Sequence, residues 1–367
     1  MRIGKIVLKN FRNYSDLSWN PHPRFNIITG DNAQGKTNLL EAVFFCTAGR
    51  SFRTARDREM INWQTEECFT SALVEKEESS YEISVFLNKI GKETFYINGS
   101  KQSKGKIFRP SLALSFTPTD LELVRGSPSE RRKWIDLELG PYDFQYIYNL
   151  NKYERVLYQR NNLLKGNTEK IGQIIEPWNE QLIFYGSKII NSRINLLKKI
   201  YVHLKNVFES LTSGATGKEE ISFNYICSIP LEKGMEPEDL PVLYEETIRK
   251  KFKEELLRKQ TLFGPHRDDL VFFINRSDAR MFGSRGQQRS VVLSLKLSLI
   301  RMFVEEYGEY PILLLDDVFL ELDSHRRKGV DRLLEGEGQV FITSNSDLGE
   351  NFSGISRTYR IEEGQLY

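Results

Sequence analysis

The stretch FNIITGDNAQGKT, residues 25–37, decides the fold. Residues 25–28 favour a short buried strand, which leads directly into a loop of the pattern GxxxxGK[ST]. Apolar residues then recur at helical spacing between Leu39 and Phe44, which predicts an amphipathic helix. Strand, glycine loop and helix form the context in which this pattern binds nucleotide phosphates. An unliganded glycine-rich turn is the alternative, and the flanking elements disfavour it.

The chemistry of this loop follows from its residue types. Its glycines let backbone N–H groups curl around phosphates, and the Lys36 ammonium reaches the β and γ oxygens. The Thr37 hydroxyl is expected to ligate Mg²⁺. The residues expected to bind ATP are Gly30, Asp31, Asn32, Ala33, Gln34, Gly35, Lys36 and Thr37.

A second motif, ILLLDD at residues 312–317, has four apolar residues followed by two acids. This pattern predicts a buried parallel strand that presents carboxylates at its C-terminal end. We expect Asp316 to hold Mg²⁺ through water and Asp317 to polarise the attacking water. Two acids that merely cap a strand are the alternative, which the glycine loop disfavours.

A third motif, GSRGQQR at residues 283–289, precedes a long apolar helix predicted over 287–306. It resembles the signature of ABC ATPases, Leu-Ser-Gly-Gly-Gln, although Gly283 and Arg285 depart from that form. A serine and a glycine at a helix N-terminus suit an anion, but a plain N-cap serine is the alternative. The predicted signature residues are Ser284, Arg285, Gly286 and Gln287.

The order of these motifs is that of an ABC ATPase, in which the signature precedes the magnesium strand by one helix. In such proteins the signature of one subunit closes on the γ-phosphate held by another, so a dimer is expected. Asp323 in Glu321-Leu322-Asp323 fits the D-loop. A further strand is expected at 339–343, and γ-phosphate sensing falls to Thr343 or the catalytic candidate Ser344, since the usual histidine is absent.

The periodicity of the apolar residues divides the chain into three parts. Residues 1–117 read mainly as strands, 118–259 read mainly as helices, and 260–367 return to an alternating pattern. The expected fold class is therefore α/β: an ABC/SMC-type P-loop ATPase head with an inserted, mainly helical lobe. Residues 116–120 occupy the place of the missing Q-loop glutamine, with Asp120 as a possible substitute.

Composition excludes several classes of function. A net charge of +2 over 367 residues gives no evidence for nucleic acid from the whole chain. The three cysteines form no CxxC pair and no metal spacing with the four histidines, which favours a reducing cytosol and disfavours structural zinc. No run of about 18 apolar residues occurs, so neither export nor a membrane-spanning segment is expected.

Local basic clusters are the candidates for DNA contact, because sequence-independent binding needs mainly positive groups. One cluster follows the first helix, one lies in the insertion, and a helix over 188–199 carries further cations including Arg193. Each cluster read alone is equally compatible with a solvated basic face. His266 lines the nucleotide site or is structural. The DNA-binding candidates are Arg50, Arg53, Arg56, Arg58, Arg131 and Arg132.

Taken together, the motifs show that the chain resembles the RecF family of SMC-related ATPases almost from end to end. The matching segments are LKNFRNY (8–14), GDNAQGKT (30–37), GRSFR (49–53), TPTDL (117–121), GPHRDD (264–269) and LDDVFLELD (315–323). The resemblance implies an ATP-dependent homodimer that binds DNA gaps or single-strand/double-strand junctions. It also implies that the dimer assists RecO and RecR in loading the recombinase RecA, in gap repair and the SOS response.

Turnover is expected to be slow, because Asp317 is one methylene shorter than the glutamate usual at that position. Stimulation of this turnover by DNA is also expected. Three other classes remain: a transporter ATPase subunit, a nuclease-associated SMC-like ATPase, and a nucleotide-dependent interaction module. The missing Q-loop glutamine and switch histidine count against the first. No nuclease-like cluster of acids and histidines supports the second.

Overall fold

The computed structural model describes residues 1–54, 56–76, 79–103, 113–140, 143–166, 171–212, 219–231, 237–317, 338–345 and 356–367. The chain forms two compact units. Unit 1 comprises Met1–Asp120, Asn206–Lys218 and Val292–Tyr367, and unit 2 comprises Leu121–Lys205 and Glu219–Val291. Residues 260–291, which the sequence texture assigned to the head, therefore lie in unit 2. The expected three-part division stays a prediction.

A six-stranded, mostly parallel sheet forms the centre of unit 1. The sequence explains its short strands, because strands buried on both faces read as continuous apolar runs. The strands predicted at 25–28, 312–315 and 339–343 are confirmed. In spatial order they are β15 (Gln365–Leu366), β14 (Ser356–Glu362), β3 (Phe25–Thr29), β13 (Val340–Ser344), β12 (Ile312–Leu315) and β8 (Ala113–Phe116).

A second sheet of unit 1 is wholly antiparallel. Its turn at Asn98-Gly99 holds both residues at positive φ, 47° and 75°, a conformation that these two residue types favour. In spatial order the strands are β2 (Tyr14–Trp19), β1 (Arg2–Phe11), β4 (Glu67–Glu75), β5 (Ser80–Asn88), β6 (Glu93–Ile97) and β7 (Ser100–Gln102).

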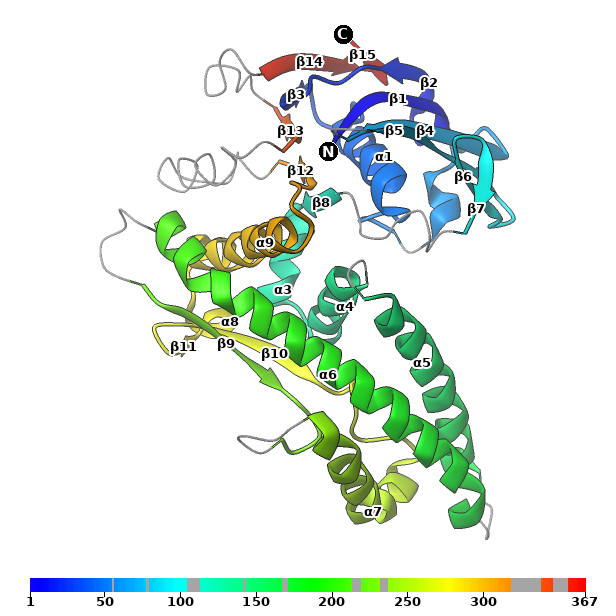
Figure 1. The fold of residues 1–367 in the computed structure, drawn as a ribbon, viewed down its shortest axis with the longest axis vertical. Helices are drawn as coiled ribbons and strands as arrows, with labels where there is room; N and C mark the ends of the chain where they lie inside the picture. The colour runs from blue at the N-terminus through cyan, green and yellow to red at the C-terminus, as the bar shows by residue number, and fades with distance from the viewer. Residues whose placement is uncertain are drawn as a thin grey trace. The chain divides into compact units, whose positions relative to one another are not determined.

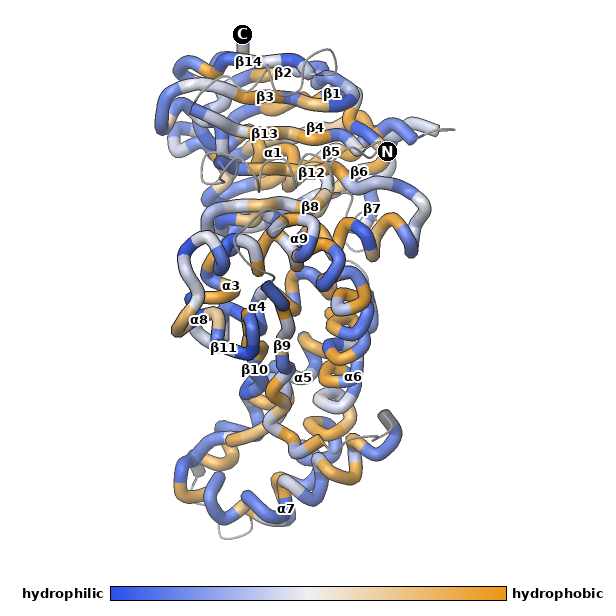
Figure 2. The backbone as a smooth tube through the Cα atoms, turned by 90° about the vertical axis from the view of Figure 1, so that its left-hand side faces the viewer, coloured by the Kyte–Doolittle hydropathy of each residue, from blue (hydrophilic) through white to orange (hydrophobic). Residues whose placement is uncertain are grey.

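Helix α1 (Lys36–Ala48) contacts strands of both sheets (Figure 1). The sequence predicts an amphipathic helix here, but α1 is buried on nearly every side because a sheet covers each flank. Figure 2 shows the same region as a concentration of hydrophobic residues along β3, β13 and α1. The main core of unit 1 joins α1 to both sheets and thereby fixes the start of the helix.

Unit 2 is mainly helical. A buried ion pair between Arg160 and Glu255, 2.6 Å apart, ties two of its helices together. A three-stranded antiparallel sheet, which the sequence reading missed, completes the unit: β11 (Ser277–Asp278), β10 (Asp269–Ile274) and β9 (Ile221–Ile226). The helices that lie in it wholly or partly are α3 (Glu122–Arg125), α4 (Pro128–Leu139), α5 (Phe144–Lys165), α6 (Ile171–Thr212), α7 (Leu240–Arg258), α8 (Ala279–Phe282) and α9 (Arg285–Tyr307).

Helix α9 confirms the long helix predicted before the acidic strand. Within the described residues, no helix combines the length and the apolar character needed to cross a membrane.

Candidate nucleotide-binding site

The glycine loop connects β3 to α1 in the conformation that the motif requires. Gly30, Ala33 and Gly35 have φ of 147°, 66° and 115°, all in the left-handed region. Such turns direct successive backbone N–H groups toward one point and form an anion-binding nest. Gly35 also caps the N-terminus of α1, where the helix dipole favours negative charge.

Lys36 is 6% exposed, and its ammonium is held from three sides. Its Nζ donates to the backbone oxygens of Gly30 and Asp31, at 2.6 and 2.9 Å, and to Asn345 Oδ1 at 2.7 Å. The ammonium is thus fixed across the mouth of the loop. Asn345 follows β13 at the place where the sequence lacks the usual histidine, and the sequence reading did not assign it a role.

Thr37, Asp316 and Thr343 form a second cluster beside Lys36. Asp316 Oδ1 accepts hydrogen bonds from Thr37 Oγ1 at 2.9 Å and from Thr343 Oγ1 at 2.8 Å. Burial raises the pKa of the Asp316 carboxyl, and the neighbouring Asp317 charge raises it further, while the two threonine hydrogen bonds oppose the shift. The structure therefore joins the glycine loop to the acidic strand, as the sequence predicts for a magnesium site.

Asp317 lies at the end of β12 with a φ of 53°, an unusual value for a non-glycine residue. Its backbone N–H donates to Thr343 Oγ1 at 2.9 Å, which holds this conformation. Among the described residues, none donates a hydrogen bond to its buried Oδ1. Hydroxyl and carboxylate oxygens are the donor set that Mg²⁺ prefers, so Thr37 and Asp316 fit the metal.

The other expected nucleotide residues are placed as follows. The Asp120 carboxylate pairs with Lys296 at 3.1 Å and accepts from the Thr117 amide at 2.7 Å, so both of its oxygens are engaged. Ser344 is fully buried at the end of β13. Its catalytic role stays a prediction, and the D-loop Asp323 lies outside the described residues.

The signature segment forms the exposed N-terminus of α9. The Gln287 amide donates to Ser284 Oγ at 3.2 Å, and the Ser284 amide donates to Gln287 Oε1 at 2.7 Å. This reciprocal pair is a capping box, so Ser284 does act as an N-cap. Ser284 and Arg285 are nevertheless exposed, and Gly286 is half-buried. Capping and anion binding use the same helix end and do not exclude each other.

The arginine loop after α1 is connected to the nucleotide loop. Arg53 Nη1 donates to Asn38 Oδ1 at 2.6 Å, and Asn38 in turn donates to Asn13 Oδ1 at 2.8 Å. Asn13 donates to the Gln34 carbonyl at 3.0 Å. Arg56 and Arg58 are exposed, whereas Arg50 is half-buried with its guanidinium over the Phe44 ring.

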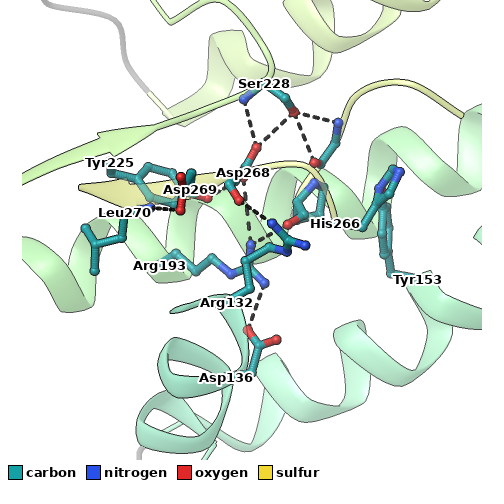
Figure 3. A network of polar contacts seen from close by, with 12 residues as sticks. Arg132, Asp136, Tyr153, Arg193, Tyr225, Ser228, His266, Asp268, Asp269 and Leu270 are labelled. Atoms are coloured by element: carbon teal, nitrogen blue, oxygen red, sulfur yellow. Dashed lines mark hydrogen bonds and ion pairs between the residues drawn. The ribbon is translucent and has the colours of Figure 1, made fainter. Parts of the chain in front are cut away.

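The second arginine cluster differs from the expectation. Arg131 is buried, and its guanidinium grips the Asp269 carboxylate through two bonds, at 2.6 and 2.9 Å, and the Gly126 carbonyl at 2.8 Å. A side chain so engaged offers no surface to a phosphate, so we withdraw Arg131 as a DNA contact. Arg132 is half-buried and donates to the Asp268 carbonyl at 2.7 Å (Figure 3).

The GPHRDD segment lies in the same charged network of unit 2, shown in Figure 3. Arg193, expected on a basic helix face, is buried and contacts Asp136 at 2.8 Å, the Pro265 carbonyl at 2.7 Å and Asp268 at 3.8 Å. His266 accepts from the Tyr153 hydroxyl at 2.7 Å through Nδ1, and its Nε2 donates to the Thr261 carbonyl at 3.3 Å. Burial lowers the pKa of His266 to about 4, so this histidine is neutral and structural.

Comparison with known proteins agrees with this geometry. Residues 2–365 match the family described as RecF/RecN/SMC N terminal domain. The chain is 38% identical over 381 residues to the DNA replication and repair protein RecF of Natranaerobius thermophilus, covering 100% of this chain and 97% of the relative. The chain belongs to the RecF family. As a member it is an ABC-type ATPase of the SMC-related kind.

Further relatives support the same family. RecF of Lactococcus lactis subsp. lactis is 40% identical over 368 residues, covering 96% of each chain. A solved structure described as the recombination mediator protein RecF bound to ATP in the RecFOR pathway superposes with a TM-score of 0.88. It is 32% identical and covers 100% of this chain and 97% of its own. An Smc head bound to the C-winged helix domain of ScpA shares the fold alone, with a TM-score of 0.56 and 15% identity, covering 100% of this chain and 96% of its own.

Proposed function

We propose that this chain is an ATP-gated DNA-binding dimer of recombinational gap repair. In this proposal the dimer works in the cytosol, binds gaps or single-strand/double-strand junctions, and assists RecO and RecR in loading the recombinase. The observation that carries the proposal is the centre formed by Lys36, Asn345, Thr37 and Asp316 in a RecF-family chain. This centre holds one half of an ATPase site whose other half, the Ser284 loop, is exposed.

A dimer is needed because the two halves of the site contact the phosphates with different groups, each from a different copy of the chain. The loop around Lys36 holds the phosphates of one nucleotide through N–H groups and an ammonium. The open start of α9, with Ser284, Arg285 and Gly286, then meets the γ-phosphate held by a second copy. ATP is therefore the bridge between the two copies, and hydrolysis removes it.

Magnesium and hydrolysis involve the acidic strand. Thr37 and Asp316 would hold Mg²⁺, which would supply charge neutralisation at the phosphates. Asp317 would orient the attacking water through its buried oxygen, which is unpaired among the residues that the structure describes. Its short side chain reaches less far than a glutamate, and turnover is accordingly slow. Slow turnover suits a switch, because the ATP-bound dimer then persists long enough to act on DNA.

The DNA surface is formed by the arginine loop of unit 1. Arg53, Arg56 and Arg58 are exposed there, and Arg53 is connected through Asn38 and Asn13 to the glycine loop. Phosphate contacts of this kind bind without reading sequence and weaken as salt rises. Arg50 and Arg132, both half-buried, are the remaining candidates.

The test is to measure binding of the chain to gapped, single-stranded and duplex DNA of equal length, each with and without ATP. We expect the gapped DNA to bind most tightly, and to do so only when ATP is present. The Lys36→Arg variant is the matched control and should show the weak binding of the ATP-free protein. Equal binding to all three DNAs, or indifference to ATP, would contradict the proposal and favour a plain nucleotide-dependent interaction module.

A further inference from the structure

The turn between β14 and β15 has an unexpected composition. Its two residues, Glu363 and Gly364, have φ of 47° and 75°, the same pair of values as in Asn98-Gly99. Glycine and asparagine adopt positive φ readily, whereas glutamate does so at a greater energetic cost. The β14–β15 turn therefore has Glu363 at the position that Asn98 occupies in the other turn, although asparagine suits positive φ better. Contacts outside the turn explain how this conformation is held.

The turn contacts the glycine loop directly. The Glu363 amide donates to Gln34 Oε1 at 2.7 Å. Gly364 packs so closely on Asn13 that a Cβ there would lie 2.7 Å from the Asn13 carbonyl oxygen. Asn13 itself donates to the Gln34 carbonyl. The turn thus contacts the side chain of Gln34 directly and is linked to its main chain through Asn13.

The strand that precedes the turn supports the beginning of the same loop. A Cβ at Gly30 would lie 2.5 Å from the Ile361 carbonyl oxygen, so the two backbones are in close contact. Thr29 Oγ1 donates to the Tyr359 carbonyl at 3.2 Å. The loop is therefore held at its first residue and at Gln34 by one hairpin at the carboxyl end of the chain.

We propose that the β14–β15 hairpin positions the glycine loop for ATP binding, with Glu363 and Gly364 as positioning residues. The loop holds three residues at positive φ, and residues of the loop and of the hairpin line the same cavity, of about 750 Å³. The hydrogen bond from the Glu363 amide to Gln34 fixes the loop before ATP arrives. Preorganisation of this kind strengthens binding by removing the entropy lost on ordering.

The primary test compares two glycine-to-alanine substitutions at equal φ. Gly364→Ala pushes the turn away from Asn13, whereas Gly99→Ala meets nothing within 4 Å and serves as the matched control. Both should lower the melting temperature, because both place a side chain at positive φ, and Gly364→Ala should lower it further because its Cβ meets the Asn13 carbonyl oxygen. Only Gly364→Ala should weaken ATP binding measured by calorimetry, by about fivefold, the equivalent of one hydrogen bond. Equal ATP affinity in the two variants would overturn the proposal.

A second variant approaches the same contact from the loop and does not disturb the hairpin. Gln34→Met removes the acceptor, so the Glu363 amide should exchange its hydrogen faster, and ATP should bind about fivefold more weakly. The double variant that combines Gln34→Met with Gly364→Ala should bind ATP within about twofold of Gln34→Met alone, because the two substitutions break the same contact. Faster exchange at Glu363 without any loss of ATP affinity, or losses that multiply in the double variant, would contradict a positioning role.

Discussion

The nucleotide centre of unit 1 and the charged network of unit 2 look alike in the sequence but differ in structure. Both contain basic and acidic residues in compact motifs. In the network, Arg193 is bound by Asp136, Asp268 and a carbonyl, and Arg131 is bound by Asp269. In the nucleotide centre, Lys36 is held across an open loop, and an oxygen of Asp317 stays unpaired among the described residues.

This difference separates structural charges from functional ones. Buried charges that satisfy one another stabilise the arrangement only while every partner is present. A buried oxygen left unpaired is destabilising unless a ligand completes it. The two regions should therefore respond to substitution in opposite ways: the network should lose stability, and the nucleotide centre should lose ligand binding.

The largest effect is expected from Arg193→Leu. This change leaves the buried Asp268 and the half-buried Asp136 without their cation, and breaking a buried ion pair typically costs about 3–5 kcal/mol of unfolding free energy. Urea unfolding measures it. Arg249→Ala is the control, because Arg249 forms an exposed ion pair with Glu245 and should change stability by less than about 0.5 kcal/mol. Similar values for both variants would show that the network is not a structural unit.

Lys36→Arg should lower the ATP affinity and leave the stability nearly unchanged, which is the opposite of the effect of Arg193→Leu. A planar guanidinium cannot replace the ammonium among the Gly30, Asp31 and Asn345 oxygens. We expect at least about a hundredfold loss of ATP affinity, roughly 3 kcal/mol, with a melting temperature close to that of the parent. Light scattering with ATP should show no association of the variant. ATP-dependent association of the Lys36→Arg variant would show that the Lys36 ammonium is not required for nucleotide-driven dimerisation.

A smaller effect is expected from pH, through His266. Its pKa is lowered to about 4 in the folded chain against 6.5 for an unperturbed histidine, so the folded state resists protonation. Above pH 6.5 the neutral His266 makes its full contribution to the free energy of unfolding, about 2–3 kcal/mol, and this contribution is lost as pH falls toward 4. The measurement is urea unfolding at several pH values. His266→Gln should reduce this pH dependence, and an unchanged profile would contradict the assignment.

Much of unit 1 could be predicted because its signals are local. The apolar runs at 25–28 and 312–315 and the turn at Asn98-Gly99 determine their structures within a few residues. The missed features depend on partners far along the chain. Asn345 meets Lys36 across 309 residues, and Arg131 meets Asp269 across 138. Charge patterns do not reveal such partners, so a basic cluster in the sequence could not be distinguished from a buried network.

The sheet of unit 2 escaped prediction for a related reason. Strand β9 is mostly half-exposed and pairs with β10, which follows it only after helix α7. Its weak alternation gives no clear period-2 signal. By contrast, the glycine loop, the acidic strand and the start of α9 were predicted, since each carries its own turn or capping residues.

The central claim is that the Lys36 loop of one copy and the Ser284 loop of another form one ATP site. The most direct test mixes two inactive variants, Lys36→Arg and Ser284→Arg, because a mixed dimer contains one intact site from the two unaltered halves. We predict that each variant alone fails to associate with ATP and that the mixture regains ATP-dependent association and turnover. A mixture as inactive as its components would contradict a site shared between copies.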